Sequence, residues 1–150
     1  MKNRSSFTLI ELLVVISVIS IIIGVVIPRF KGMQDEANKA KAKAELKTLQ
    51  TAVESFFINQ TPQEYPASTG TICLTYLNSA SPVIVSTPLY DPFASAGDEY
   101  IYEIAPSGSY YVIFSVGPNQ SRDIGGVGDD GYLTGNQDDD IYVTNGLGWT

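Results

Sequence analysis

Acidic and amide side chains gather in one glycine-rich stretch of the chain, from Ser115 to Ile141. It contains six glycines together with Asn119, Asp123, Asp129, Asp130, Asn136, Asp138, Asp139 and Asp140. Carboxylates crowded into one segment repel one another, and Ca²⁺ relieves such repulsion by binding about six to eight oxygen ligands. The Asp-x-Asp-x-Asp-Gly spacing of an EF-hand is absent. The stretch therefore predicts either an irregular calcium loop or a solvated acidic loop without metal.

The groups that usually perform nucleophilic or acid–base catalysis are missing from the sequence. The chain has no histidine, one cysteine (Cys73) and no Gly-x-Ser-x-Gly motif, so only carboxylates could transfer protons. A lone cysteine forms no internal disulfide, and we interpret Cys73 as a small buried apolar side chain. We therefore expect a protein that is not an enzyme.

Charge is distributed unevenly along the chain. Arg122 is the only basic residue after Ile58, whereas eleven acidic residues follow that position. Nucleic-acid binding requires clustered Lys and Arg against the phosphates, so this composition excludes nucleic acid as a ligand. It favours a cation or a basic partner.

One carboxylate, Glu11, lies inside an otherwise apolar run from Phe7 to Ile27. As a helix this run is about 30 Å long, which matches the hydrocarbon core of a membrane. A carboxylate inside such a helix is costly and needs a partner. Lys2 and Arg4 precede the run and predict that the amino end stays in the cytoplasm. The sequence thus predicts a single membrane span followed by an exported domain.

A hexamer with Glu11 at its fifth position resembles the processing signal of type IV pilins and type II secretion pseudopilins. It reads Phe-Thr-Leu-Ile-Glu-Leu and follows a short basic leader. The resemblance implies that a prepilin peptidase cuts between Ser6 and Phe7, that the new terminus is methylated, and that Glu11 pairs with the terminal amine of a neighbouring copy. The family has Gly where this chain has Ser6. A plain signal anchor with a tolerated Glu is the alternative.

The segment from Phe30 to Asn59 is expected to continue the same helix, now amphipathic. Its apolar residues recur at three- and four-residue steps: Phe30, Met33, Ala37, Ala40, Ala44, Leu46, Leu49, Val53, Phe56 and Phe57. Pro28 removes a helical hydrogen bond, so bending or local unwinding is expected between Gly24 and Pro28, a region that loosens on assembly in the resembled family. The chain is thus divided into a leader (1–6), a membrane and polymerisation helix (7–28) and an exported domain (29–150).

The second half of the chain is expected to form short strands. Tyr100–Ile104 and Tyr110–Ser115 flank a Gly-containing turn and predict a β-hairpin that packs on the amphipathic helix. We also expect a short helix at Ile72–Leu77 and a short strand or extended segment at Val83–Val85. The predicted fold class is α+β: a long amino-terminal helix packed on a small antiparallel sheet, with a long acidic carboxyl-terminal loop.

A second set of residues resembles the major pseudopilins of type II secretion: Asp91-Pro92-Phe93, the strand pair, Ser115-Val116-Gly117-Pro118-Asn119 and Gly148-Trp149. The resemblance implies a calcium site. Its ligands would be the Val116 carbonyl, Asn119, Asp139 and Asp140, with Asp123 and Asp130 as alternatives. Asn119 stands where the family has Asp, which removes one negative charge from the site. The Trp near the end is implied to hold the tail against the domain.

These features predict a structural subunit of a type II secretion pseudopilus, which polymerises through its amino-terminal helix to support protein export. The expected location is the bacterial inner membrane, with the globular domain in the periplasm. Expected partners are other copies of the chain, minor pseudopilins, the inner-membrane assembly platform and prepilin peptidase. Two alternatives stay open: a type IV pilin of a surface fibre, and a membrane-anchored calcium-dependent binding module that does not polymerise.

Overall fold

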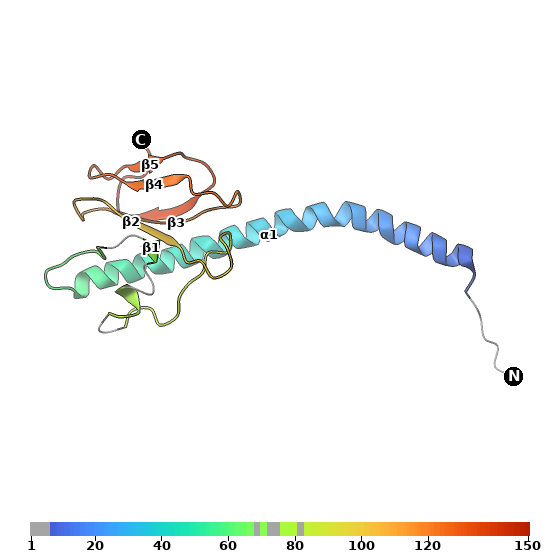
Figure 1. Cartoon of the computed structure of the whole chain (residues 1–150), viewed down its shortest axis with the longest axis horizontal. Helices are drawn as coiled ribbons and strands as arrows, with labels where there is room; N and C mark the ends of the chain where they lie inside the picture. The colour runs from blue at the N-terminus through green and yellow to red at the C-terminus, as the bar shows by residue number, and fades with distance from the viewer. Residues whose placement is uncertain (1–6, 68–69, 72–75, 81–82) are drawn as a thin grey trace. The chain divides into compact units, whose positions relative to one another are not determined.

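The computed structural model describes residues 7–67, 70–71, 76–80 and 83–150. It divides into two compact units, Met1–Ala37 and Asn38–Thr150, which we describe separately. One long α-helix, α1 (Leu9–Asn59), begins in the first unit and ends in the second, as Figure 1 shows. The predicted end of the helix at Asn59 is confirmed.

The first unit contains the apolar part of α1, whose large side chains are exposed. Phe7 is 82% exposed, Ile21 69% and Met33 70%. The hydroxyls of Ser17 and Ser20 donate to backbone carbonyls one turn earlier in the same helix. An apolar surface with its polar groups satisfied internally is suited to lipid or to other apolar helices. By length and composition, this part of α1 could cross a membrane.

The backbone between Gly24 and Pro28 is helical throughout, because α1 runs without a break from Leu9 to Asn59. The local unwinding that Pro28 suggested is therefore not present in the structure. Loosening of this segment on assembly stays a prediction.

In the second unit, one face of α1 packs on an antiparallel sheet. The buried helix residues recur at four- and three-residue steps: Ala42, Leu46, Leu49, Val53 and Phe56. They pack against aromatic and aliphatic side chains of the sheet, including Tyr102, Tyr111 and Ile113. The amphipathic pattern of the sequence predicted this packing. Five residues of that pattern are exposed and do not belong to the packed face: Phe30, Met33, Ala37, Ala40 and Ala44.

Tyrosine hydroxyls of the sheet side also bind the helix through its glutamates. Tyr111 and Tyr65 donate to the two carboxylate oxygens of Glu54 at 2.7 and 3.1 Å, and Tyr100 donates to Glu45 at 2.7 Å. Burial, together with the nearby carboxylate, raises the pKa of Tyr100 and Tyr111, so both remain neutral donors. These bonds fix the angle at which the sheet meets α1.

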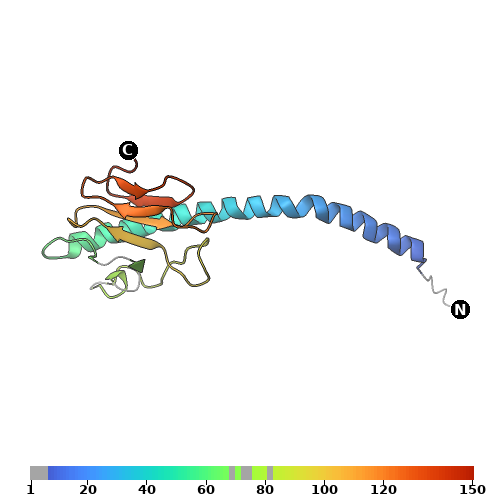
Figure 2. The same ribbon diagram turned by 45° about the horizontal axis from the view of Figure 1, so that its top comes forward.

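The main sheet has the strand order β1-β2-β3-β6, and all its pairs are antiparallel. Its strands are β1 (Gly70–Thr71), β2 (Ile101–Ile104), β3 (Tyr111–Ser115) and β6 (Ile141–Thr144). β2 and β3 form the hairpin that the sequence predicted, with Tyr102 opposite Ile113. Figure 2 shows these strands lying against the last turns of α1.

A second, two-stranded sheet forms from β4 (Ile124–Val127) and β5 (Leu133–Gly135). Its apolar side chains Ile124, Val127 and Leu133 form a separate cluster with Val112 and Phe114 of β3. β3 is therefore buried on both faces, with α1 on one side and the β4–β5 hairpin on the other.

This hairpin corrects the expectation of a single long acidic loop from Ser115 to Ile141. Two central glycines, Gly125 and Gly126, interrupt the alternation of apolar and polar side chains in β4, so the segment lacks the usual strand pattern. Three apolar side chains nevertheless suffice, because β3 offers them an already formed apolar face. The tail is fixed as well: Trp149 packs on the same cluster, and Leu133 N–H donates to the Gly148 carbonyl at 2.8 Å.

Two further expectations fall in the middle of the chain. Val83–Val85 contains no strand; Ile84 and Val85 both donate N–H groups to the Leu77 carbonyl. The expected helix at Ile72–Leu77 lies mostly outside the described residues, and so does Cys73.

Candidate assembly site and candidate metal centre

Glu11 lies in the first turn of α1, where its carboxylate forms reciprocal hydrogen bonds with Thr8. The Thr8 hydroxyl and N–H donate to Glu11 Oε2 at 2.7 and 2.9 Å, and the Glu11 N–H donates to the Thr8 hydroxyl at 3.3 Å. This pattern is a capping box, which satisfies N–H groups that a helix start leaves without partners. The family resemblance implies only an assembly role for Glu11. The Thr-x-x-Glu spacing is the signal that could have revealed this second role.

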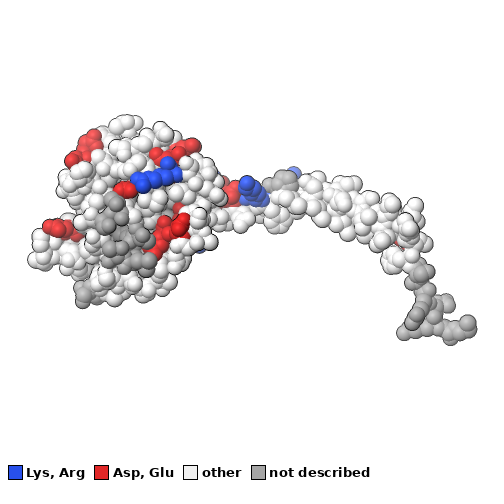
Figure 3. All heavy atoms as spheres, viewed as in Figure 1, with Lys and Arg blue, Asp and Glu red and all other residues white. Residues whose placement is uncertain are grey.

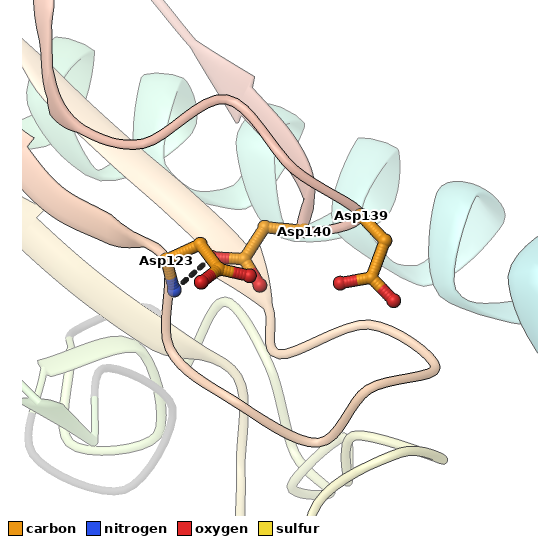
Figure 4. Close-up of side chains that lie close together, drawn as sticks. All are labelled: Asp123, Asp139 and Asp140. Atoms are coloured by element: carbon orange, nitrogen blue, oxygen red, sulfur yellow. Dashed lines mark hydrogen bonds between the residues drawn. The ribbon is translucent and has the colours of Figure 1, made fainter.

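Three carboxylates of the acidic stretch converge beside the start of β6. Asp123, Asp139 and Asp140 each place an oxygen within 4.8 Å of the others. Figure 4 shows Asp123 entering from the segment before β4, and Asp139 and Asp140 from the segment before β6. Oxygens this close together are near enough to share one cation. We call these three residues the acidic cluster.

Hydrogen bonds hold the two segments of the acidic cluster together. Asp140 Oδ2 accepts the N–H groups of Asp123 and Ile124 at 2.9 and 2.8 Å. Asp139 Oδ2 accepts the Asn119 N–H at 2.8 Å, and the Asn119 side-chain amide donates to Asp123 Oδ2 at 3.0 Å. Asn119 thus serves as a link between the carboxylates, a role its amide can fill and an Asp could not.

Two oxygens of the acidic cluster lack such partners. Asp139 Oδ1 and Asp140 Oδ1 are buried and accept no hydrogen bond from the part of the chain that the structure describes. Burial raises the pKa of Asp140 despite its two backbone hydrogen bonds, and the charges of Asp123 and Asp139 raise it further. Unsatisfied buried acceptors are costly. A donor set of carboxylate oxygens with unsatisfied acceptors fits a hard cation such as Ca²⁺.

The backbone around the acidic cluster is closely packed at Gly117. Its φ of +66° is favourable mainly for glycine, and a Cβ there would lie 2.5 Å from the Asp139 carbonyl oxygen. The turn after β3 can therefore approach Asp139 only because residue 117 has no side chain.

Asp91 anchors the same turn from the other side. It is 5% exposed, and its Oδ1 accepts the Ser115 hydroxyl at 2.7 Å and the Phe93 N–H at 3.0 Å. Its Oδ2 accepts the Val116 N–H at 3.0 Å. Sequence reasoning noted the Asp91-Pro92-Phe93 motif but gave Asp91 no role. The structure makes it the residue that positions the start of the turn.

The predicted metal ligands are thus only partly brought together. Asn119, Asp123, Asp139 and Asp140 meet, whereas Asp130 lies in the β4–β5 turn, where its Oδ1 accepts the Tyr132 N–H at 3.1 Å. Asp130 is too far along that hairpin to belong to the acidic cluster. Val116 is held at the edge of the turn through its N–H.

Two lysines of α1 face the acidic cluster across a shallow groove. The groove is lined by Lys39, Lys43, Asp139, Asp140, Ile141 and Tyr142. Lys39 and Lys43 are one helical turn apart, so both ammonium groups contribute positive potential on the same side of α1.

Comparisons with known proteins agree with these features. Residues 1–27 match the family described as the prokaryotic N-terminal methylation motif. The chain is 28% identical to the type II secretion system core protein G of Escherichia coli (strain K12), over 95% of this chain and 91% of that protein. The same protein of Klebsiella pneumoniae is 28% identical over 92% of this chain and 94% of its own length.

The chain is therefore similar to type II secretion pseudopilins over nearly its whole length and has the methylation motif at its amino end. The type IV major pilin protein PilA of Myxococcus xanthus (strain DK1622) is also similar to this pilin-like chain, with 45% identity over 37% of the chain and 25% of that protein. No solved structure matches it. The likeness to core protein G covers nearly the whole chain, and the likeness to PilA covers about a third.

Proposed function

We propose that this chain is a structural subunit of a type II secretion pseudopilus and supports protein export by polymerising through the apolar part of α1. The observation that carries the proposal is the methylation motif at 1–27 placed at the start of an exposed apolar helix that contains Glu11. Similarity to core protein G along nearly the whole chain supports the same conclusion. The role is structural rather than enzymatic.

In this proposal, cleavage between Ser6 and Phe7 frees an amine that becomes the partner of a Glu11 carboxylate on a neighbouring copy. Both hydrogen bonds from Thr8 end on Glu11 Oε2, which leaves Oε1 to receive that amine. The capping box therefore fixes the rotamer of Glu11 before assembly. The energy of a charge pair in apolar surroundings depends strongly on the distance between the two groups, so the pair sets the register of the fibre.

The acidic cluster is proposed to bind calcium. Asp123, Asp139 and Asp140 would supply carboxylate oxygens, and the unsatisfied Oδ1 atoms of Asp139 and Asp140 would be the first to gain from the ion. Asn119 would keep the segments aligned. An ion bound only by the folded state stabilises the domain by mass action. Asp130 is not included.

The proposed setting is the bacterial inner membrane, with the domain from residue 29 onward in the periplasm. α1 supplies one helix long and apolar enough to span a membrane. Prepilin peptidase would process the chain, and minor pseudopilins and the inner-membrane assembly platform would be its partners in the fibre. A surface type IV pilus is the second candidate, supported by the similarity to PilA over about a third of the chain.

Replacing Glu11 with alanine tests the proposal. We expect Glu11→Ala to lower the amount of fibre sheared from cells by about ten-fold or more, because the terminal amine loses its counter-charge. The matched control is Ser20→Ala, which removes another polar group from the same exposed part of α1. Both variants should insert into the membrane equally. Normal fibre yield with Glu11→Ala would contradict polymerisation and favour the anchored binding module.

A further inference from the structure

The globular unit has two chemically different ends along α1. Two contacts mark the two ends of the unit along α1. Nearer the amino end of the helix, Lys39 and Lys43 lie beside Asp139 and Asp140. Nearer its carboxyl end, Glu54 binds Tyr111 at the start of β3. The β2–β3 turn, just before Tyr111, therefore lies at the far end of the unit. We call the end near Lys39 the proximal end and the end near the β2–β3 turn the distal end.

The distal end carries the acidic β4–β5 turn. Asp129 Oδ1 accepts the Ser107 N–H at 2.8 Å, which places this turn against the β2–β3 turn. Asp129 and Asp130 are both exposed. Each uses one oxygen for a turn hydrogen bond, so a second oxygen on each faces solvent. We call Asp129 and Asp130 the acidic tip.

The acidic tip has no basic neighbour of its own in the described part of the chain. Arg122 is the only basic residue after Lys47, and its guanidinium is engaged by Glu103 at 2.8 Å and by the carbonyls of Ile124 and Gly125. Figure 3 shows acidic atoms spread over the face of the globular unit that it draws. The acidic tip is therefore open to positive charge on another molecule.

The proximal end offers that charge on α1. Lys39, Lys43 and Lys47 recur every four residues and so lie along one stripe of the helix. Lys43 and Lys47 are exposed. We call these three residues the lysine stripe. If calcium neutralises the acidic cluster beside Lys39 and Lys43, the stripe becomes more positive toward a neighbour.

We propose that the acidic tip of one copy docks on the lysine stripe of the next copy in the fibre. The inference rests on the proposed function, because copies that enter a fibre from one membrane have parallel helices. Parallel copies meet distal end to proximal end, and such a head-to-tail contact repeats without closing. A single exposed ion pair adds little affinity, but complementary charge fixes orientation, whereas like charges facing each other are strongly unfavourable.

Charge reversal on each side tests the contact in the full-length chain. The tip-reversed chain carries Asp129→Lys and Asp130→Lys, and the stripe-reversed chain carries Lys43→Glu and Lys47→Glu. Each alone places like charges together, so we expect each to lower the yield of sheared fibres by about ten-fold. Thermal melting in saturating calcium checks that the globular domain folds in each of the two variants.

Co-expression of the two variants gives the decisive result. In a mixed fibre that alternates the two variants, reversed tips meet reversed stripes and ordinary tips meet ordinary stripes. We therefore expect fibres at about half the yield of the unaltered chain or more. Combining all four substitutions in one chain should also restore fibres. A contact within one molecule could be rescued by the combined chain but not by mixing.

The control variant reverses the charge of an exposed acid outside the acidic tip, the lysine stripe and the acidic cluster. Asp98→Lys should leave fibre yield unchanged. Normal fibres from the tip-reversed chain, or no rescue by mixing, would overturn the docking proposal. If Glu11→Ala abolishes fibres while charge reversal has no effect, only the docking proposal fails. If Glu11→Ala has no effect either, the proposed function fails with it.

Discussion

At the scale of single residues, Asp140 has two carboxylate oxygens in opposite surroundings. Oδ2 accepts two backbone N–H groups, and Oδ1 is buried without a hydrogen bond from the described residues. Burial raises the pKa of Asp140 above its ordinary value. Its contribution to stability is therefore complete below the ordinary pKa and is lost as the pH rises through the raised folded pKa. At neutral pH the metal-free fold carries an unfavourable charge.

We expect Asp140→Asn to raise the melting temperature of the calcium-free protein at pH 7. The amide keeps an acceptor for Asp123 N–H and Ile124 N–H and removes the buried charge. The same change should cut the rise in melting temperature on adding calcium by more than about half, because a charged ligand is lost. Thermal melts in chelator and in calcium, at pH values from 4 to 7 (roughly the range in which the carboxylate titrates), measure both effects.

Asp130→Asn is the matched control, since this aspartate lies outside the acidic cluster and the amide keeps an acceptor for Tyr132 N–H. It should leave the calcium effect unchanged. A chain whose melting temperature is the same in chelator and in calcium would refute metal binding altogether.

At the scale of elements, the turn after β3 depends on the close approach of Gly117 to Asp139. Gly117→Ala adds a Cβ 2.5 Å from the Asp139 carbonyl oxygen at a positive φ. Gly97→Ala is the comparison, because Gly97 has φ +96° and no heavy atom within 4 Å of the added Cβ. We expect both to lose stability through backbone strain, about 1 kcal/mol. Only Gly117→Ala should also weaken the calcium-induced rise in melting temperature, because it displaces Asp139.

The packing of α1 on the main sheet is tested by Leu49, which is fully buried. Leu49→Ala leaves a cavity beneath the sheet and should lower the free energy of unfolding by about 2–5 kcal/mol. Thr48→Ala, one position away on the exposed side of α1, should change it by about 0.5 kcal/mol or less. Urea unfolding of both variants gives the comparison. Equal effects would mean that α1 does not pack as described.

At the scale of the whole molecule, the proposed function requires that the chain be processed before it enters a fibre. The methylation motif covers residues 1–27 and includes Ser6, where the resembled family has Gly. We expect Ser6→Gly to increase the fraction of chains that begin at methylated Phe7, because glycine fits a peptidase cleft more easily than serine. Mass spectrometry of membrane-extracted protein measures this fraction. Intact chains beginning at Met1 in both proteins would contradict processing.

For the candidate metal site, the sequence and the tertiary structure give different information. The sequence placed Asn119 and the three residues of the acidic cluster within one stretch, but it could not exclude Asp130. Asp123 and Asp140 are separated by a hairpin whose strands contain glycines in place of alternating apolar residues. Their meeting depends on Asp140 accepting the Asp123 N–H, a contact between distant positions.

The sequence alone determined the features that local patterns encode. An unbroken apolar run requires an apolar environment, and the hexamer with Glu11 belongs to a methylation motif. The three- and four-residue spacing of Leu46, Leu49 and Val53 directs one face of α1 to a core. The β2–β3 hairpin follows from its turn and its β-branched and aromatic strands. Each of these features depends on residues that are close together in the sequence.

Tertiary structure decided what depends on distant contacts. β4 and β5 exist because β3 presents a second apolar face to Ile124, Val127 and Leu133. The same hairpin separates Asp130 from the acidic cluster and places it at the acidic tip. Glycine-rich strands with few apolar side chains are stable only on a surface formed by other residues, and no pattern within the strands themselves records that surface.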